Sequence, residues 1–455
     1  MDGFRRRKME EREDWIKSVD YNLFKLEGNQ ISIDLLTDNG TGSMSCRQWA
    51  AWAKETGTGA GPSSFAKAEE KVRQMFGLEH VLFVHQGRTG GNILLSEFVK
   101  ENNTIPANSH TDNNRAYIEF QQATAEDCPL GDAFCITNHH PFKGNIDIQK
   151  LEFVLRVQYD NVPFILVSIT CEKTGGQPIS IQNLREVKDL ARQYGVPVVF
   201  DSARFAENAW FIQQREPTYA SSTIRDIVRE MHQYADAVIL NRQSNGLVGA
   251  GCIVATRDRD WFEAASRKVI LFEGHTSYGE MPRRYMEALI VGLDEMTCDD
   301  YLRSRVCQVE RFGEKLATAG VPIQQPIGGH AVAIDAANFL PNVPRDQFVA
   351  HTLAVQLYVD AGIRGTDIGT LMNDRDPNTG HNRYAQAEFM CLAIPRRIYS
   401  DEQLNAVFEA LIHIHGRQSS YTHGFQIMKE SGPRRYITVS LARVSEGEQD
   451  LVKVT

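Results

Sequence analysis

Short runs of consecutive apolar residues alternate with amphipathic stretches through the first two thirds of the chain. Residues 163–170 and 196–200 are two such runs, and residues 184–194 between them carry apolar side chains at helical spacing. Uninterrupted apolar runs are typical of parallel strands, because helices cover both faces of such a sheet. Gly195 follows the amphipathic stretch and suits the end of a helix. The pattern therefore predicts two buried strands connected by a helix.

The same order of elements occurs before and after this unit. Residues 65–76 are spaced as a helix, residues 80–84 as a short buried strand, and a polar turn at 86–91 leads into a further helix through Phe98. Residues 237–240 form another apolar strand-like run. Alternating strands and helices predict an α/β protein with a mostly parallel, helix-flanked sheet. Its binding site is expected at the carboxyl ends of the strands.

The pattern changes near residue 310. A long helical stretch at 301–319 is followed by a strand-like segment at 331–335 and a loop rich in Asp, Asn and Gly at 373–382. A chain of 455 residues also exceeds the size at which one hydrophobic core usually divides. We therefore predict a large domain at 46–310 and a smaller C-terminal domain at 311–455.

Composition and charge narrow the classes of partner. The 58 acidic and 49 basic residues give a net charge of -9, which disfavours nucleic acid, because its phosphates require a basic surface. No apolar run approaches the ~20 residues needed to cross a bilayer, and no signal-peptide core is visible. The eight cysteines lack CxxC spacing, so neither a metal site nor a disulfide framework is indicated. We expect a reduced cytosolic protein that binds a small molecule, without nucleic-acid, membrane or metal partners.

Polar residues follow three of the predicted strands. The turn Gln86-Gly87-Arg88 opens a helix, where free backbone N–H groups and the helix dipole favour an anion such as phosphate. Asp201 ends a buried strand, and its carboxylate suits a heterocyclic N–H or an ion pair with Arg204. Residues 241–243 follow the strand at 237–240. Such turns and ion pairs also serve purely structural roles, so alone they assign no function.

Longer stretches resemble the aromatic amino acid β-eliminating lyases, the family of tryptophanase and tyrosine phenol-lyase. The resemblance spans about residues 30–400 and is carried by IDLLTDNGTGSMS (33–45), HQGRTGGN (85–92), TGGQPIS (174–180), FDSARFAENAWFI (200–212), FEG and SYG (272–279), GGHAVAIDA (328–336) and AIPRRIY (393–399). It implies fold type I of the pyridoxal phosphate enzymes, with a large aminotransferase-like domain and a small domain. Residues 1–45 would then be an N-terminal arm that contributes to the small domain.

The resemblance also implies a cofactor pocket. In that family pyridoxal phosphate forms an imine with a lysine, its phosphate sits on the glycine turn, and an aspartate holds the pyridine nitrogen. By position, Gln86, Gly87 and Arg88 match the phosphate turn. Asp201 matches the aspartate, and Arg204 matches an arginine near the phenolic oxygen of the cofactor.

The imine-forming lysine of the family has no counterpart at the matching position. The chain reads Asn241-Arg242-Gln243-Ser244-Asn245 there, and no lysine occurs between Tyr234 and Arg257. None of these side chains carries a basic primary amine, which an imine requires. We therefore expect no covalent cofactor, with pyridoxal phosphate bound non-covalently as an alternative.

Among the further positions that depart from the family, three belong to the predicted pocket. Its ring-stacking aromatic residue falls at Thr111, its asparagine beside the cofactor falls at Glu172, and its carboxylate-binding arginine falls at Cys391. These exchanges remove a cation and add an anion where an α-carboxylate would lie. A free amino acid should therefore bind poorly in the pose that the family uses.

The leading hypothesis is a divergent lyase-type enzyme that acts on a small amino-acid-derived or aromatic metabolite. Glu172 would be a general base, and Asp201 with Arg204 a polar clamp. Lys173 lies beside Glu172 and should point the opposite way along an extended segment. The remaining candidate pocket residues are His110, Thr111, Asn241, Gln243 and Cys391.

Several alternatives stay open at this point. The chain is compatible with non-covalent use of pyridoxal phosphate or its amine form, with a catalytically dead homologue that serves as a binding or partner subunit, and with a lyase whose lysine has moved. The retained polar residues also fit a purely structural role. Family members are homotetramers built from dimers, so the resemblance implies a homodimer or homotetramer.

Overall fold

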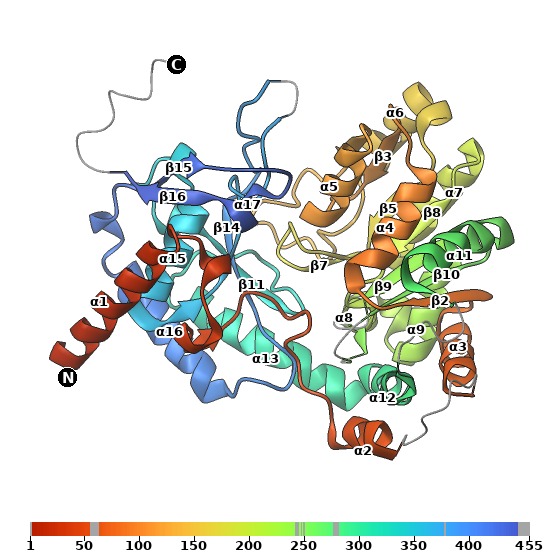
Figure 1. The fold of residues 1–455 in the computed structure, drawn as a ribbon, viewed down its shortest axis with the longest axis horizontal. Helices are drawn as coiled ribbons and strands as arrows, with labels where there is room; N and C mark the ends of the chain where they lie inside the picture. The colour runs from red at the N-terminus through yellow and green to blue at the C-terminus, as the bar shows by residue number, and fades with distance from the viewer. Residues whose placement is uncertain are drawn as a thin grey trace.

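The computed structural model describes residues 2–54, 63–241, 245–246, 248, 251–275, 282–376 and 379–444. The elements form two halves that lie side by side (Figure 1). One half is built on the main sheet, and the other combines the N-terminal helix with the C-terminal elements. Within the described residues, no helix combines the length and apolar character needed to cross a membrane.

A seven-stranded sheet in the order β2-β10-β9-β8-β5-β3-β4 forms the centre of the larger half. The pairs β4–β3, β3–β5, β5–β8 and β8–β9 are parallel, which confirms the predicted mostly parallel α/β sheet. In contrast, β10 runs antiparallel to both β9 and β2, which the sequence pattern did not indicate. The strands are β2 (His80–Val84), β3 (Thr104–Ala107), β4 (Thr124–Asp127), β5 (Ile165–Ser168), β8 (Val198–Asp201), β9 (Ala237–Asn241) and β10 (Cys252–Thr256).

Helices cover both faces of this sheet (Figure 1). Successive side chains of a strand point to opposite faces. Val198 and Phe200 of β8 accordingly belong to one core cluster, and Val199 belongs to another. The first face is packed by α3 (Ser63–Phe76), α6 (Ile148–Gln158), α7 (Ile181–Tyr194), α8 (Phe205–Arg215), α9 (Ile224–Met231) and α12 (Arg283–Met296), with α2 (Cys46–Lys54) outside it. The second face is packed by α4 (Gly87–Phe98), α5 (Asp112–Phe120) and α11 (Arg259–Glu273).

The boundaries of α7 show how local sequence sets an element. The predicted helix at 184–194 is confirmed, but it begins three residues earlier, at Ile181. The Ser180 side chain accepts a hydrogen bond from the Asn183 N–H, which satisfies one of the free donors of the first turn. At the other end, Gly195 has a φ of 67°, a left-handed conformation that costs glycine little.

The smaller half contains a three-stranded antiparallel sheet in the order β11-β14-β13. One core cluster joins residues 16–35 of the chain to residues 309–441, so the N-terminal segment packs with the C-terminal elements. Its strands are β11 (Ala331–Asp335), β13 (Thr366–Ile368), β14 (Phe389–Ala393), the pair β1 (Ile33–Asp34) and β12 (Ile363–Arg364), and the hairpin β15 (Phe425–Lys429) and β16 (Ser440–Arg443). Its helices are α1 (Asp2–Ser18), α13 (Asp299–Thr318), α14 (Ala336–Phe339), α15 (Val349–Ala361), α16 (Asp401–His415) and α17 (Arg435–Thr438).

Candidate functional site

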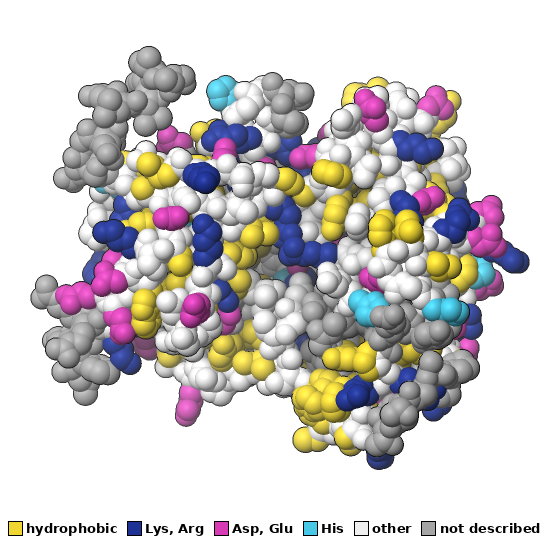
Figure 2. All heavy atoms as spheres, in the orientation of Figure 1, with side chains coloured by type: hydrophobic (Ala, Val, Ile, Leu, Met, Phe, Trp, Pro, Cys, Tyr) yellow, Lys and Arg dark blue, Asp and Glu magenta, His cyan; other side chains and the backbone are white. Residues whose placement is uncertain are grey.

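A cavity of about 750 Å³, called the main cavity below, lies between the two halves. Figure 2 shows the hollow between them, with Lys and Arg side chains at its edge. The larger half contributes residues that follow β2 and end β9, and the smaller half contributes residues of β11, β13 and β14. The polar and charged residues of its wall include Asp38, Asn39, His85, Gln86, Arg88, Asp112, Glu172, Arg204, Asn241, His330, Arg434 and Tyr436.

The predicted glycine turn lies on the wall of the main cavity. Gln86 is the N-cap of α4, and Gly87 is the first helical residue, so unpaired N–H groups of the first turn lie at the cavity. A Cβ atom at Gly87 would lie 2.6 Å from Nδ2 of Asn241, which leaves no room for a larger residue unless Asn241 moves. Arg88 forms no ion pair within the part of the chain that the structure describes. The turn therefore offers free donors and an unmatched cation to an anion.

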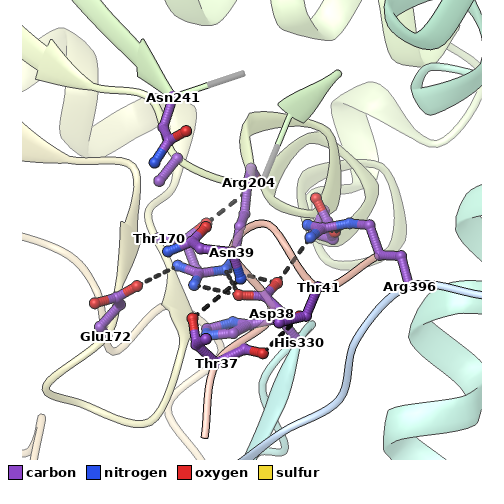
Figure 3. A network of polar contacts seen from close by, with 12 residues as sticks. Thr37, Asp38, Asn39, Thr41, Thr170, Glu172, Arg204, Asn241, His330 and Arg396 are labelled. Atoms are coloured by element: carbon purple, nitrogen blue, oxygen red, sulfur yellow. Dashed lines mark hydrogen bonds and ion pairs between the residues drawn. The ribbon is translucent and has the colours of Figure 1, made fainter. Parts of the chain in front are cut away.

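Arg204 forms the centre of a buried charge network (Figure 3). Its Nη2 lies 2.6 Å from Oδ1 of Asp38, and its Nη1 lies 2.6 Å from Oε1 of Glu172. Arg204 has a positive φ of 61°, a strained conformation for a residue with a side chain, which the surrounding contacts must hold. Thus the carboxylate partners of Arg204 are Asp38 and Glu172.

The network continues away from the main cavity. Nη1 of Arg396 lies 2.8 Å from Oδ2 of Asp38, and Arg396 also pairs with Glu207. Arg305 approaches the same two carboxylates, at 3.5 Å from Asp38 and 3.8 Å from Glu207. We call Asp38, Arg204, Glu207, Arg305 and Arg396 the arginine cluster. It joins the N-terminal segment, the larger half and the smaller half through buried charges.

Asp38 is ionised because of these partners. Burial alone would raise the pKa of its carboxyl, but the adjacent guanidinium groups of Arg204 and Arg396 outweigh burial and hold that pKa well below its ordinary value. The stretch at 33–45 contains Asp38, and the stretch at 393–399 contains Arg396. Neither residue was singled out from the sequence, because nothing local indicates that they meet.

Asp201 is placed at the end of β8, as expected from the sequence. Its Oδ2 accepts a hydrogen bond from Nδ2 of Asn114 at 3.2 Å, and its Oδ1 accepts one from the Ala203 N–H at 3.3 Å. Burial, followed by the negative charge of Glu172, raises the pKa of the Asp201 carboxyl. A cationic N–H donor placed against it would favour its ionised form.

The other predicted residues have diverse environments. Asn241 and Cys391 line the main cavity, and burial raises the pKa of the Cys391 thiol, which favours a neutral wall residue over a nucleophile. Thr111 is the N-cap of α5, and its hydroxyl accepts a hydrogen bond from the Asn114 N–H. Gln243 lies outside the described residues. Among those residues, no group of three or more His, Cys, Asp or Glu side chains has the arrangement of a metal site.

His110 and Lys173 occupy a second region. His110 is buried, and its Nδ1 lies 2.7 Å from Oδ1 of Asp127. Lys173 lines a separate cavity of about 210 Å³, whereas its neighbour Glu172 lines the main cavity. The two side chains therefore line different spaces, as expected, but residues 172–175 form a turn and not the extended segment from which this was predicted.

Sequence reasoning missed Asp112, Arg434 and Tyr436, which meet on the wall of the main cavity. Nε of Arg434 lies 2.8 Å from Oδ2 of Asp112, and the Tyr436 hydroxyl donates to the same oxygen. Burial, together with the Asp112 charge, raises the pKa of Tyr436. Arg434 and Tyr436 come from the last fifth of the chain, in which no motif was recognised.

Comparison with known proteins places the chain among lyases. The family model for beta-eliminating lyases matches residues 34–410. A probable beta-eliminating lyase of Trichomonas vaginalis is 45% identical over 96% of this chain and 95% of its own length. A tryptophanase of Salinibacter ruber is 41% identical over 95% of this chain and 91% of its own length. A tyrosine phenol-lyase of a Symbiobacterium species is 38% identical over 96% of this chain and 95% of its own length.

Solved structures support the fold. A serine palmitoyltransferase of Sphingomonas wittichii superposes with a TM-score of 0.57 at 14% identity, covering 85% of this chain and 88% of that one. A related structure, described as SPT with a PLP internal aldimine, gives a TM-score of 0.56 at 15% identity, with 86% and 88% covered. Both share fold type I with this chain, as the resemblance implied.

One expectation needs correction. From the residues at 241–245 we expected no covalently bound pyridoxal phosphate, but the matching family and the structural neighbours consist of enzymes that hold this cofactor covalently. The expectation failed because it relied on a single position, and residues 242–244 lie outside those that the structure describes. With a family model over most of its length and relatives at 38–45% identity, the chain belongs to the beta-eliminating lyase family.

Proposed function

We propose that this protein is a lyase that catalyses β-elimination on a small amino-acid-derived substrate in the main cavity, with pyridoxal phosphate as cofactor. The observation that carries the proposal is that the glycine turn and the Arg204–Glu172 pair line one cavity, in a chain that belongs to the beta-eliminating lyases. Asp201 ends β8, three residues before Arg204. The tryptophanase and tyrosine phenol-lyase relatives support an amino acid as the substrate class.

The residues of this chain fit two parts of the cofactor, its phosphate and its ring nitrogen. The phosphate would be held by the N–H groups at the start of α4 and by Arg88, which has no ion-pair partner among the described residues. The space at Gly87, which a Cβ would fill, suits a close approach of the phosphate to the backbone. Asp201 would hold the ring nitrogen, and pairing with a cationic N–H would offset its raised pKa. When bound, pyridoxal phosphate supplies an electron sink for the bonds at the substrate Cα.

The charges of the main cavity suit a zwitterion. Its wall carries the cations Arg88, Arg204 and Arg434 and the anions Asp38, Asp112 and Glu172. Equal numbers of both signs favour a ligand that presents an ammonium and a carboxylate over one that is strongly anionic or cationic. Phe24 and Tyr436 add aromatic surface for an apolar side chain.

Glu172 is proposed as the general base. Its carboxylate is partly exposed to the main cavity, and the guanidinium of Arg204 fixes one of its oxygens at 2.6 Å. Arg204 is itself fixed by Asp38, so the direction of the Glu172 carboxylate depends on two buried partners. The second oxygen is then available to take a proton from the substrate.

The test is the change Glu172→Gln, assayed with a panel of amino acids for release of 2-oxo acid and ammonia. We expect kcat to fall by about 10²–10⁴-fold, the usual contribution of a general base. The affinity for pyridoxal phosphate, measured by absorbance titration, should stay close to that of the unchanged protein. Glu152→Gln, at an exposed position of α6, is the matched control.

Two results would count against these assignments. An unchanged kcat in Glu172→Gln would show that Glu172 is not the general base. Absence of 2-oxo acid from every amino acid, in protein saturated with pyridoxal phosphate, would contradict the proposed function itself.

We also propose that the chain assembles at least as a homodimer. Ile270, Leu271 and Phe272 near the end of α11 are 58%, 75% and 69% exposed, an unusual run of apolar side chains for a free surface. Light scattering should give the mass of two or four chains, and a monomer mass would reject the assembly.

A further inference from the structure

The second cavity, of about 210 Å³, is lined by basic side chains from three separate segments. They are Arg115 of α5, Lys173 in the turn after β6 (Thr170–Cys171), and Arg383. Asp127, at the end of β4, is the only carboxylate among the described residues of this wall. We call this space the Lys173 cavity. Its wall therefore has an excess of positive charge, unlike the balanced wall of the main cavity.

Two of the three cations already have a carboxylate partner. Nη2 of Arg115 lies 2.5 Å from Oδ2 of Asp127. Nη1 of Arg383 lies 2.7 Å from Oε1 of Glu119, which is outside the wall of the cavity. Two carboxylates thus neutralise the two arginines, and Lys173 supplies the charge that remains unmatched.

The contacts of Lys173 do not compensate its charge. Its Nζ donates a hydrogen bond to Oδ1 of Asn373 at 3.2 Å, and among the described residues it forms no ion pair with a carboxylate. Burial lowers the pKa of Lys173, the charge of Asp127 opposes this effect, and the like charge of Arg115 adds to it. An anion beside the ammonium would offset the cost of burying it. One negative charge is enough to make the cavity neutral.

The rest of the wall indicates what kind of anion fits. Its apolar part consists of Pro129, Phe134, Ile368, Ala385 and Ala387. The short alkyl chain of an organic acid is stabilised by contact with such a surface, whereas an inorganic anion has no apolar part to bury there. The volume corresponds to roughly seven water molecules at about 30 Å³ each, which restricts the ligand to a small molecule.

We propose that the Lys173 cavity is a non-covalent binding site for a small organic monocarboxylate. The carboxylate pairs with the protonated amine of Lys173, and the alkyl chain packs on the apolar part of the wall. Arg115 and Arg383 keep their own carboxylate partners. The site is distinct from the main cavity, although Ile368 belongs to the walls of both. Binding there involves no step of the proposed β-elimination.

The test is a calorimetric titration of the full-length protein at neutral pH and low salt. Butyrate, butyramide and inorganic phosphate are the three probes, each titrated separately. Butyramide has the shape of butyrate without its charge, and phosphate has charge without an alkyl chain. We expect butyrate to bind on the order of ten-fold more tightly than either, because each lacks one of the two interactions.

Three variants locate the site of binding. Lys173→Met removes the unmatched charge and should weaken butyrate binding on the order of ten-fold, the loss of one charge-assisted hydrogen bond. Glu119→Gln removes the partly exposed carboxylate beside Arg383, so the wall gains positive charge and butyrate should bind about three-fold more tightly. Lys100→Met, at an exposed position after α4, is the matched control and should leave the affinity unchanged.

The outcomes that overturn the proposal are specific. One is equal affinity for butyrate in Lys173→Met and Lys100→Met, with both proteins folded by circular dichroism. Another is phosphate or butyramide binding as tightly as butyrate. If Lys173→Met does not fold, the Glu119→Gln titration decides, since tighter binding of butyrate supports the site and unchanged binding overturns it. The titrations need no turnover, so this site and the proposed β-elimination can fail separately.

Discussion

The arginine cluster and a pair of acids in the smaller half bury carboxylates to a similar extent, yet their charges behave in opposite ways. Asp38 in the cluster is 0% exposed, and Asp367 in β13 is 6% exposed. Burial acts on both carboxyls in the same direction, toward a higher pKa. The pKa of Asp38 is nevertheless well below its ordinary value, and that of Asp367 is well above it.

The difference comes from the neighbours of each carboxylate. Asp38 is held by Arg204 and Arg396 at 2.6 and 2.8 Å. Asp367 faces Glu388, whose negative charge is the second cause of its raised pKa after burial, and its Oδ1 has no hydrogen-bond partner among the described residues. Burial thus makes a charge costly, and the partner decides whether the charge is kept.

The largest effect is expected from removal of the Asp38 charge. Asp38→Asn should lower the free energy of unfolding by about 3–5 kcal/mol, because Arg204 and Arg396 would remain buried without their shared partner. Urea denaturation at neutral pH measures this loss. The paired control is Asp401→Asn, which removes an exposed carboxylate 2.9 Å from Arg311 and should cost about 0–1 kcal/mol. Similar losses in both variants would mean that burial of the cluster is irrelevant.

A smaller change of opposite sign is expected at the acid pair. Asp367→Asn should raise the free energy of unfolding at neutral pH by about 0.5–2 kcal/mol, because the asparagine side chain is neutral in both states, whereas the folded protein must hold a proton on Asp367 that the unfolded chain releases. A loss of stability in this variant would show that the Asp367 carboxylate has a stabilising partner.

The pH dependence of stability independently tests the direction of the two pKa shifts. The folded state keeps a proton on Asp367 at pH values where the unfolded chain has released it. The free energy of unfolding therefore falls as pH rises toward the raised pKa of Asp367. Asp38 behaves in reverse, because its contribution is present above the ordinary pKa and is lost as pH falls through its lowered pKa. The free energy of unfolding should therefore be measured from acidic to neutral pH. In Asp367→Asn, the fall with rising pH that Asp367 causes should disappear.

Much of the sheet could be predicted, because the buried strands read as uninterrupted apolar runs. The strands at 80–84 and 237–240 were placed almost to the residue. The direction of β10 was not indicated, because β10 is buried on both faces and its apolar run therefore reads like those of the parallel strands. The start of α7 was missed because the capping hydroxyl of Ser180 lies outside the apolar pattern.

Only part of the candidate site could be predicted from the sequence. Residues at strand ends, such as Arg88, Glu172 and Asn241, lie on the main cavity, because the carboxyl ends of parallel strands meet there. Asp38 was missed because its partner Arg396 lies 358 residues further along the chain. No local pattern records such a contact. The cofactor expectation failed for a related reason, since one position was read without the rest of the family.

The pairing of the N-terminal segment with residues 309–441 has a consequence during synthesis on the ribosome. At the usual rate of about 5–20 residues per second, Arg396 is added roughly 20–70 s after Asp38. Until residues from Val309 onward have been synthesised, Ile16, Leu23 and Leu35 lack the strands and helices that cover them. The nascent chain therefore exposes an apolar segment for most of its translation, and chaperones that bind such segments have their longest opportunity at its first residues.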